Sequence, residues 1–192
     1  TYEEQYVPRL RLYQIMNVKN IQLESSENWG DMAYGWYLTA RFQWDPWMDE
    51  QAFKRDYFDK LYGAAGKLME KAHDMLLKSY KMPQNKKFVK YTYRLSVGGD
   101  TLSEIDSLIA RSLELTAKDP RAQSAVQRFG LVRDFYRSFS RTMDVLADYY
   151  VSKASYQESC KALDNFESVC RKVFYPRAAV SYWGSIPFAK TL

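Results

Sequence analysis

Apolar side chains recur every three or four positions over residues 101–174. The repeat falls into three stretches, about 101–118, 121–153 and 155–174, and this spacing places the apolar residues on one face of an α-helix. Three amphipathic helices with short connections can bury those faces against one another. The sequence therefore predicts a mainly α-helical fold, an antiparallel helical bundle. The second stretch carries Val126, Phe129, Val132, Phe135, Tyr136, Phe139, Met143, Leu146 and Tyr150.

Helix ends are marked at several places. Asp49 is expected to be an N-cap, because its carboxylate can accept bonds from the first free backbone N–H groups. Gly63 and Gly66 predict a break, after which the helical pattern resumes and extends to about Tyr80. The run 101–104, Thr-Leu-Ser-Glu, predicts a capping box at the start of the first bundle helix.

The N-terminal part is predicted to be less regular. Residues 2–17 have helical spacing, but Pro8 lacks a backbone N–H and must lie in a first turn or at a kink. Residues 18–23 alternate and are the best strand candidate in the chain. A helix over 32–42 follows, with Asp31 as its cap. We therefore expect at most one or two short strands, all near the N-terminus.

Composition argues against several classes of function. The 28 Lys and Arg residues exceed the 23 Asp and Glu residues to give a net charge of +5, but the basic residues are spread out, so we expect neither a nucleic-acid nor a membrane partner. Cys160 and Cys170 would lie about 15 Å apart on one helix, too far for a disulfide. His73 is the only histidine, in a partly exposed structural role, and we expect no metal or organic cofactor.

Seven aromatic residues lie between Trp29 and Trp47. Aromatic side chains at helical spacing are more often part of a core than of a ligand platform. We therefore expect Trp36, Phe42 and Trp44 to be buried, while the roles of the remaining aromatic residues stay open.

Four residues near the predicted strand are candidates for binding a sugar. Glu24 directly follows the strand, so its carboxylate could accept bonds from sugar hydroxyls while the Trp29 ring stacks on the sugar. Asp31 and Tyr34 complete this set. The alternative is that Glu27 or Asp31 only caps the next helix and Trp29 anchors the core. Glycoside hydrolysis needs two facing carboxyl groups about 5 to 9.5 Å apart, and no such pair is predicted, so no catalytic residue is assigned.

The most specific motif lies within residues 34–65. It is a Tyr-x-x-Ala-Arg-x-x-Trp-Asp-Pro run, then an Asp, a Phe and a Tyr-Gly-Ala-Ala segment. The matching residues are Tyr37, Ala40, Arg41, Trp44, Asp45, Pro46, Asp56, Phe58, Tyr62, Gly63, Ala64 and Ala65. The motif resembles the signature of the bacterial domain-of-unknown-function family 4838, with weaker agreement at 21–24 and 101–119. The chain departs from the family at Leu61, where an aromatic residue is common.

This resemblance implies a part in a larger protein. Proteins of the family are similar to α-glucuronidases and hexosaminidase-like enzymes, with a (β/α)₈ barrel followed by a helical domain, in secreted or periplasmic glycan-degrading systems. Residues 1–48 would then be the last barrel strand and its helix, and residues 49–192 the helical domain. That domain would brace the barrel and border the sugar site, with the rest of the parent chain and a barrel-bound glycan as partners. A barrel takes about 250 residues, so a glycosidase parent is implied but this chain lacks a complete active site.

A second interpretation is a stand-alone helical binding or interaction module without catalysis. Its exposed tryptophan and tyrosine residues would engage a protein or a glycan. A severed barrel strand should instead leave unpaired edges and a bare apolar face, so the presence of such a face distinguishes the two interpretations.

Overall fold

The computed structural model of this chain describes residues 2–21, 33–79 and 97–174. In chain order these residues form α1 (Tyr2–Ile15), α2 (Ala33–Trp44), α3 (Glu50–Tyr62), the short 3₁₀ helix η1 (Gly63–Ala65), α4 (Gly66–Ser79), α5 (Gly99–Leu115), α6 (Pro120–Tyr150) and α7 (Tyr156–Phe174). The described residues contain no strand. The prediction of a mainly α-helical bundle is confirmed.

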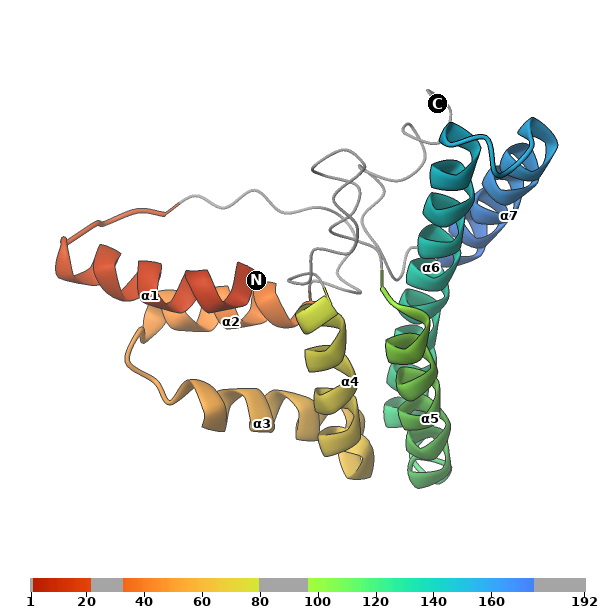
Figure 1. Cartoon of the computed structure of the whole chain (residues 1–192). Helices are drawn as coiled ribbons and strands as arrows, with labels where there is room; N and C mark the ends of the chain where they lie inside the picture. Colours follow the sequence, from red (N-terminus) through yellow and green to blue (C-terminus); the bar gives the residue numbers. More distant parts are fainter. Residues whose placement is uncertain (1, 22–32, 80–96, 175–192) are drawn as a thin grey trace.

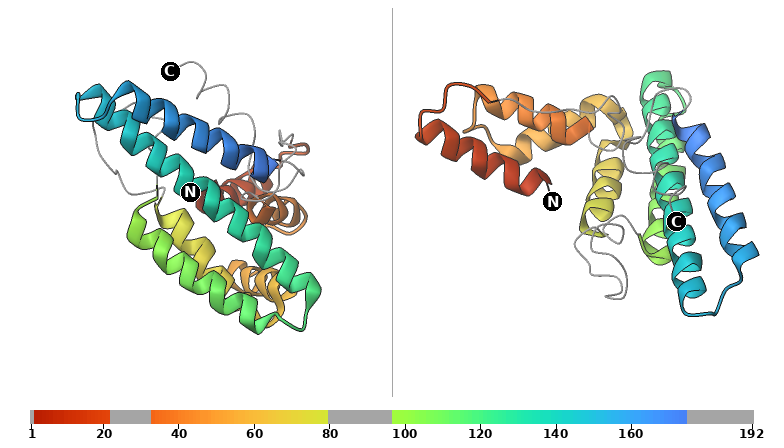
Figure 2. Two further views of the ribbon diagram at one scale, coloured as in Figure 1. Left: turned by 90° about the vertical axis from the view of Figure 1, so that its right-hand side faces the viewer. Right: turned by 90° about the horizontal axis from the view of Figure 1, so that it is seen from above.

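The helices are arranged around α6, the longest of those described (Figure 1). α5 runs antiparallel along the N-terminal half of α6, and α7 runs antiparallel along its C-terminal half. α4 lies antiparallel beside α5 on the other side. Helices α1, α2 and α3 project from α4 away from the α5–α7 layer, as Figure 1 and the right view of Figure 2 show. We call these three helices the arm.

The arm has its own apolar packing. α1 contributes Val7 and Leu10, which are 0% and 3% exposed, and α2 contributes Leu38 and Phe42, both 0% exposed. The Phe42 ring meets Phe53 of α3 edge-on, with 5.6 Å between ring centroids. Pro8 lies inside α1, which begins at Tyr2. The first-turn position that the sequence allowed is therefore excluded.

The predicted N-cap at Asp49 and the predicted break at Gly63 are both confirmed. The Asp49 carboxylate accepts bonds from the backbone N–H groups of Gln51 (2.9 Å) and Ala52 (3.0 Å), and the Ala52 bond helps to lower the pKa of Asp49 below its usual value. The predicted break is η1, where Gly63 has a φ of 53°. This backbone conformation lets the chain turn from α3 into α4 within three residues.

The predicted capping box at 101–104 is wrong. α5 begins at Gly99 with Gly98 as its N-cap and without a side-chain cap, so Thr101 already lies inside the helix. A capping box does form at the start of α7, where the Ser155 N–H donates to the Glu158 carboxylate (2.7 Å) and the Glu158 N–H donates to the Ser155 hydroxyl (3.2 Å). Both sites have the Ser/Thr-x-x-Glu pattern, but only the second forms the capping box.

A tertiary contact explains the early start of α5. The backbone N–H of Val97 donates to the hydroxyl of Ser140 in α6 at 2.8 Å, and this bond is buried. Val97 itself is 3% exposed. Because the chain is fixed to α6 at this point, the helix begins directly after it, two residues ahead of Thr101.

The predicted strand over 18–23 is only partly within the described residues. Residues 18–21 form no strand, and residues 22 and 23 lie outside. The Val18 N–H donates to the Tyr13 carbonyl (2.9 Å) and the Asn17 N–H to the Gln14 carbonyl (3.0 Å), with Asn17 at a φ of 57°. These bonds form a Schellman motif that ends α1, so Val18 completes a helix rather than beginning a strand.

The two cysteines behave as predicted. Both lie in α7 and both are free thiols. Cys170 is 0% exposed, and burial raises its thiol pKa to about 12. The thiol is therefore a small core side chain.

We predict that Gly63→Ala destabilises the fold by about 1 to 3 kcal/mol, because an L-residue is strained at this positive φ. The added Cβ would also lie 3.2 Å from the Asp119 carboxylate. Urea unfolding followed by circular dichroism measures the change. Gly99→Ala is the matched control: no atom lies within 4 Å of its Cβ, so its stability should stay within about 1 kcal/mol of wild type. Equal effects of both substitutions would contradict the argument.

Candidate functional site

One of the four predicted sugar-binding residues lies in the described part of the chain. Glu24, Trp29 and Asp31 lie outside it. Tyr34 is in the first turn of α2 and is 4% exposed. Its ring is 5.1 Å from that of Tyr57 and 5.4 Å from that of His73, measured between centroids. Tyr34 thus belongs to the packing between arm and bundle, and its contact with a sugar stays a prediction.

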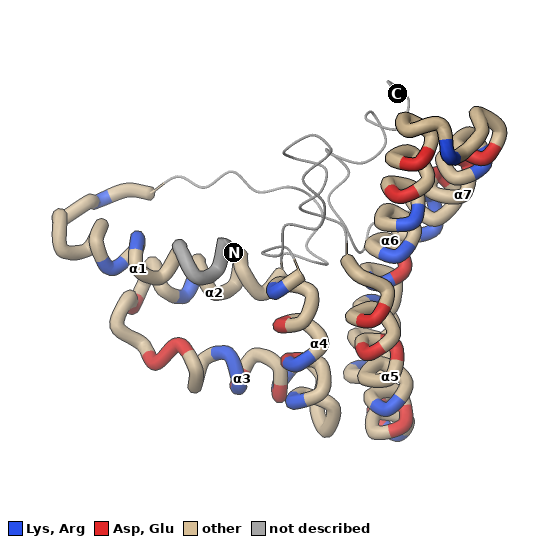
Figure 3. Tube along the Cα trace, in the orientation of Figure 1, with Lys and Arg blue, Asp and Glu red and all other residues tan. Residues whose placement is uncertain are grey.

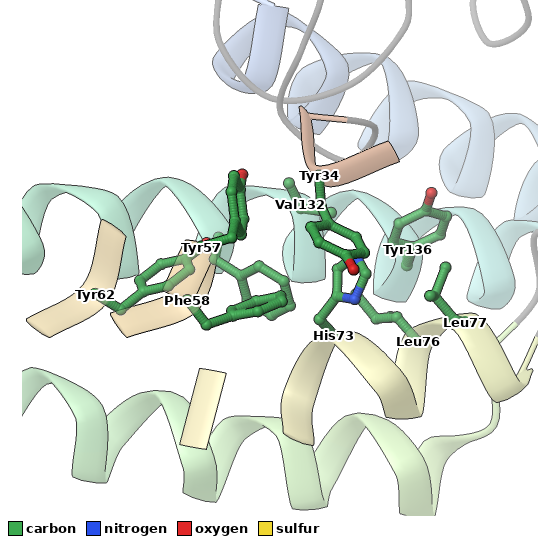
Figure 4. Close-up of a pocket in the computed structure, with 10 residues that line it drawn as sticks. Tyr34, Tyr57, Phe58, Tyr62, His73, Leu76, Leu77, Val132 and Tyr136 are labelled. Atoms are coloured by element: carbon green, nitrogen blue, oxygen red, sulfur yellow. The ribbon is translucent and has the colours of Figure 1, made fainter. Parts of the chain in front are cut away.

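The side chains around Tyr34 enclose a small cavity (Figure 4). Its volume is about 30 Å³, room for one or two water molecules but not for a pyranose ring. Residues of α2, α3, α4 and α6 line it: Tyr34, Tyr57, Phe58, Tyr62, His73, Leu76, Leu77, Phe129, Val132 and Tyr136. Burial also raises the pKa of Tyr62. This junction is a packing site and is too small to be a glycan cleft.

His73 is more deeply buried than predicted. Its side chain is 9% exposed and packs between the rings of Tyr34 and Phe58, with its Nδ1 atom 3.8 Å from the Asp74 carboxylate. Asp74 in turn pairs with Lys54 of α3. Burial acts to raise the pKa of Asp74, but hydrogen bonds with His73 and Lys54 outweigh burial and lower it. These contacts join α3 to α4.

The described residues offer no metal site. No group of three or more His, Cys, Asp or Glu side chains in residues 2–21, 33–79 and 97–174 could hold a metal ion. Acidic and basic residues are interspersed along α3, α4, α5, α6 and α7, as Figure 3 shows. Within that same part of the chain, no helix combines the length and the apolar character needed to cross a bilayer.

The most unusual surface lies on α2. Tyr37, Ala40, Arg41 and Trp44 follow the i, i+3, i+4, i+7 spacing, so they share one side of the helix, and all four are exposed. Tyr37 is 43% exposed although its ring stacks on Phe53, and Trp44 is 90% exposed. We call these four residues the outer face of α2.

The predicted burial of Trp44 is therefore wrong, whereas that of Phe42 is confirmed and Trp36 is half-buried. Successive residues of a helix are about 100° apart. Leu38 and Phe42 point to the core, and Trp44, two positions beyond Phe42, falls about 200° away on the opposite side.

The outer face of α2 continues into the end of the arm. The Arg11 side chain donates from Nε to the Pro46 carbonyl at 2.8 Å, and its guanidinium lies 5.7 Å from the centroid of the Trp47 ring. Trp47 is 62% exposed, and Ile15 and Met16 at the end of α1 are 70% and 64% exposed. The end of α1 and the α2–α3 turn lie at the same end of the arm (Figure 1), and the Arg11 contacts join them.

The motif of residues 37–65 divides into two parts by burial. In α3 and η1, Phe58, Tyr62 and Ala65 are 2%, 7% and 0% exposed, so packing within this chain accounts for them. In α2, the outer face contacts solvent. Packing among the described residues does not explain why that half of the motif carries Trp44.

A second exposed aromatic group was missed in the sequence. Tyr150 was assigned to the apolar stripe of its helix, but it is 56% exposed at the end of α6, beside Tyr149 (40%) and opposite Tyr156 (69%) of α7. The signal available was a pair of tyrosines followed by Val151 and the turn residues Ser152-Lys153.

No protein-family model matches this sequence, and neither a curated protein nor a solved structure matches it significantly.

We predict that Lys54→Met lowers the free energy of unfolding by about 0.5 to 1 kcal/mol at pH 7, because Asp74 loses its partner. The pKa of Asp74 is lowered in the folded state from its ordinary 3.8, so the stabilisation exists above that value and is lost as the pH falls through the folded-state pKa. The difference between wild type and variant, measured by urea unfolding, should thus shrink from pH 7 to pH 3.

Lys60→Met is the control for this prediction. Lys60 pairs with Asp56 on the exposed side of α3, at 2.8 Å and with 74% and 52% of the two side chains exposed. It should shift the urea midpoint less than Lys54→Met. A Lys54→Met effect that stays constant down to pH 3 would mean that packing of the lysine stem, rather than its charge, matters.

Proposed function

We propose that this chain is the helical portion of a glycoside-hydrolase-like, carbohydrate-active protein, in which it braces the catalytic barrel and borders the sugar site. The observation that carries the proposal is the outer face of α2, where Trp44 is 90% exposed. In the proposal, the rest of the parent chain covers this face. By the resemblance alone, the parent belongs to a secreted or periplasmic glycan-degrading system.

The size of the exposed surface supports a covering partner. A tryptophan can bury about 150 to 250 Å², which at about 25 cal/mol per Å² stabilises a contact by roughly 4 to 6 kcal/mol. Scattered exposed apolar residues are normal, whereas a contiguous patch marks an interaction site. Trp44 and Trp47 are exposed at the end of α2 and in the α2–α3 turn, and Ile15 and Met16 are exposed at the end of α1.

The two sides of α2 suit a barrel helix. In a (β/α)₈ barrel each strand is followed by a helix that lays one side on the sheet. Residues 18–21 form no strand, so the assignment rests on α2 alone, which has one buried and one exposed side. Its inner side packs on α1 and α3 through Leu38 and Phe42, which leaves the outer face of α2 as the side for the sheet.

The stand-alone binding module is the second candidate, because a separate protein could also cover the exposed Trp44, although a bare apolar face is what the barrel interpretation leads us to expect. The two candidates differ in what the gene encodes ahead of Thr1. A barrel parent requires about seven further βα units in the same reading frame.

We predict that Trp44→Ala changes the stability of the isolated 192-residue chain by less than about 0.5 kcal/mol, as an exposed substitution should. In the parent protein the same substitution should cost about 3 kcal/mol or more, because it empties a buried tryptophan site. Thermal melting of both proteins measures the pair of effects, and hydrogen exchange of α2 should be slower in the parent.

Tyr156→Ala is the matched control, because Tyr156 is 69% exposed and lies far from the arm (Figure 1). It should leave the melting temperature of both proteins unchanged. The proposal fails if Trp44→Ala is equally harmless in the parent, or if the upstream frame encodes no barrel.

A further inference from the structure

The turn between α6 and α7 presents three tyrosine rings to solvent. Tyr149, Tyr150 and Tyr156 are 40%, 56% and 69% exposed. The Tyr149 ring centroid lies 6.1 Å from that of Tyr150 and 6.5 Å from that of Tyr156. We call these three residues the tyrosine tip. It lies on the far side of the molecule from the arm (Figure 1), so it is separate from the outer face of α2.

The backbone under the tyrosine tip is fixed on both sides. On the α6 side, the Ser152 N–H donates to the Tyr149 carbonyl (3.0 Å) and the Lys153 N–H to the Asp148 carbonyl (2.7 Å), which is a Schellman motif. On the α7 side, the capping box of Ser155 holds the first turn. Binding of a ligand would therefore cost little conformational entropy of the backbone.

The charges around the tip favour an uncharged ligand. Asp148 and Lys153 are both exposed, and they carry opposite charges. Polyphosphates, nucleic acids and anionic lipids are held by clusters of Lys or Arg, which the turn residues 148–156 do not provide.

Tyrosine rings suit a ligand that is apolar on its faces and polar at its edges. The face of an aromatic ring is electron-rich and attracts the positive edges of C–H groups, and the hydroxyl can exchange hydrogen bonds at the rim. A pyranose offers both kinds of contact. The exposed Asp148 carboxylate, next to Tyr149 in the sequence, supplies an acceptor for sugar hydroxyls.

The other exposed aromatic surface fits a sugar less well. The Trp47 ring has the Arg11 guanidinium over it at 5.7 Å, and Trp44 belongs to the face that we assign to the parent chain. The rings of the tyrosine tip contact one another, and their exposure leaves area for a ligand.

We propose that the tyrosine tip is an accessory binding site for a neutral oligosaccharide. The choice of a glycan rests on the proposed function, but the site is remote from the barrel-facing arm. A glycan chain bound there would be kept at a raised local concentration around the parent protein.

Isothermal titration of the 192-residue chain with three neutral probes, cellohexaose, xylohexaose and mannohexaose, tests the proposal. We expect at least one of them to bind. The double variant Tyr150→Ala, Tyr156→Ala should weaken that binding by at least about tenfold, or 1.4 kcal/mol. Tyr150→Phe with Tyr156→Phe should keep most of it, because the rings remain. Circular dichroism confirms that each variant is folded.

Tyr13→Ala is the matched control, since Tyr13 is 36% exposed but lies in α1 of the arm; it should bind like wild type. Binding of none of the three hexasaccharides by wild type, or unchanged binding by the double alanine variant, overturns the proposal. Neither result bears on the docking of the arm, which Trp44→Ala tests separately. Conversely, a failed docking test together with a positive titration leaves the tyrosine tip as a glycan site.

Discussion

The burial of the Phe58 ring holds the two halves of this molecule together. Phe58 is 2% exposed and touches a ring from α2, Tyr34 at 5.6 Å, and one from α4, His73 at 5.3 Å. It also stacks on Tyr62 of its own helix at 5.8 Å. These contacts require the chain to turn sharply between α3 and α4 (Figure 1), which the positive φ of Gly63 permits. The direction of the arm therefore follows from an aromatic junction and one glycine.

The bundle depends on one long helix, α6, which packs against α5 along its first half and against α7 along its second half (Figure 1). Its rings Phe135 and Tyr136 are both 1% exposed. Arg133 and Arg137 of α6 both pair with Asp106 of α5. Because these charges are partly exposed, their pairing contributes little to stability, and the apolar contacts of α6 provide most of it.

Local signals in the sequence predicted the helices well but could not decide between two similar sites. Periodicity depends on neighbours three and four residues apart, so it located the helices after residue 49 to within a few residues. The Ser/Thr-x-x-Glu pattern occurs at both Thr101 and Ser155. The hydroxyl of Ser140 fixes the chain ahead of the first site, and this contact joins residues 43 positions apart. Such tertiary contacts are invisible to a local pattern, as was the exposure of Trp44, which depends on where α1 and α3 pack.

The exposed aromatic residues allow a distinction between surfaces that need a protein partner and those that do not. On the outer face of α2, exposure is concentrated in the indole of Trp44, which has few polar atoms to satisfy in water. Such a ring is best stabilised by dry, close packing. The rings of the tyrosine tip carry hydroxyls, and Asp148, Lys153 and Ser155 are their polar neighbours in the sequence. These rings tolerate water and suit a ligand that binds through water-mediated contacts and exchanges readily. A helical body with one surface of each kind can be fixed to a parent at the first and still contact a substrate chain at the second.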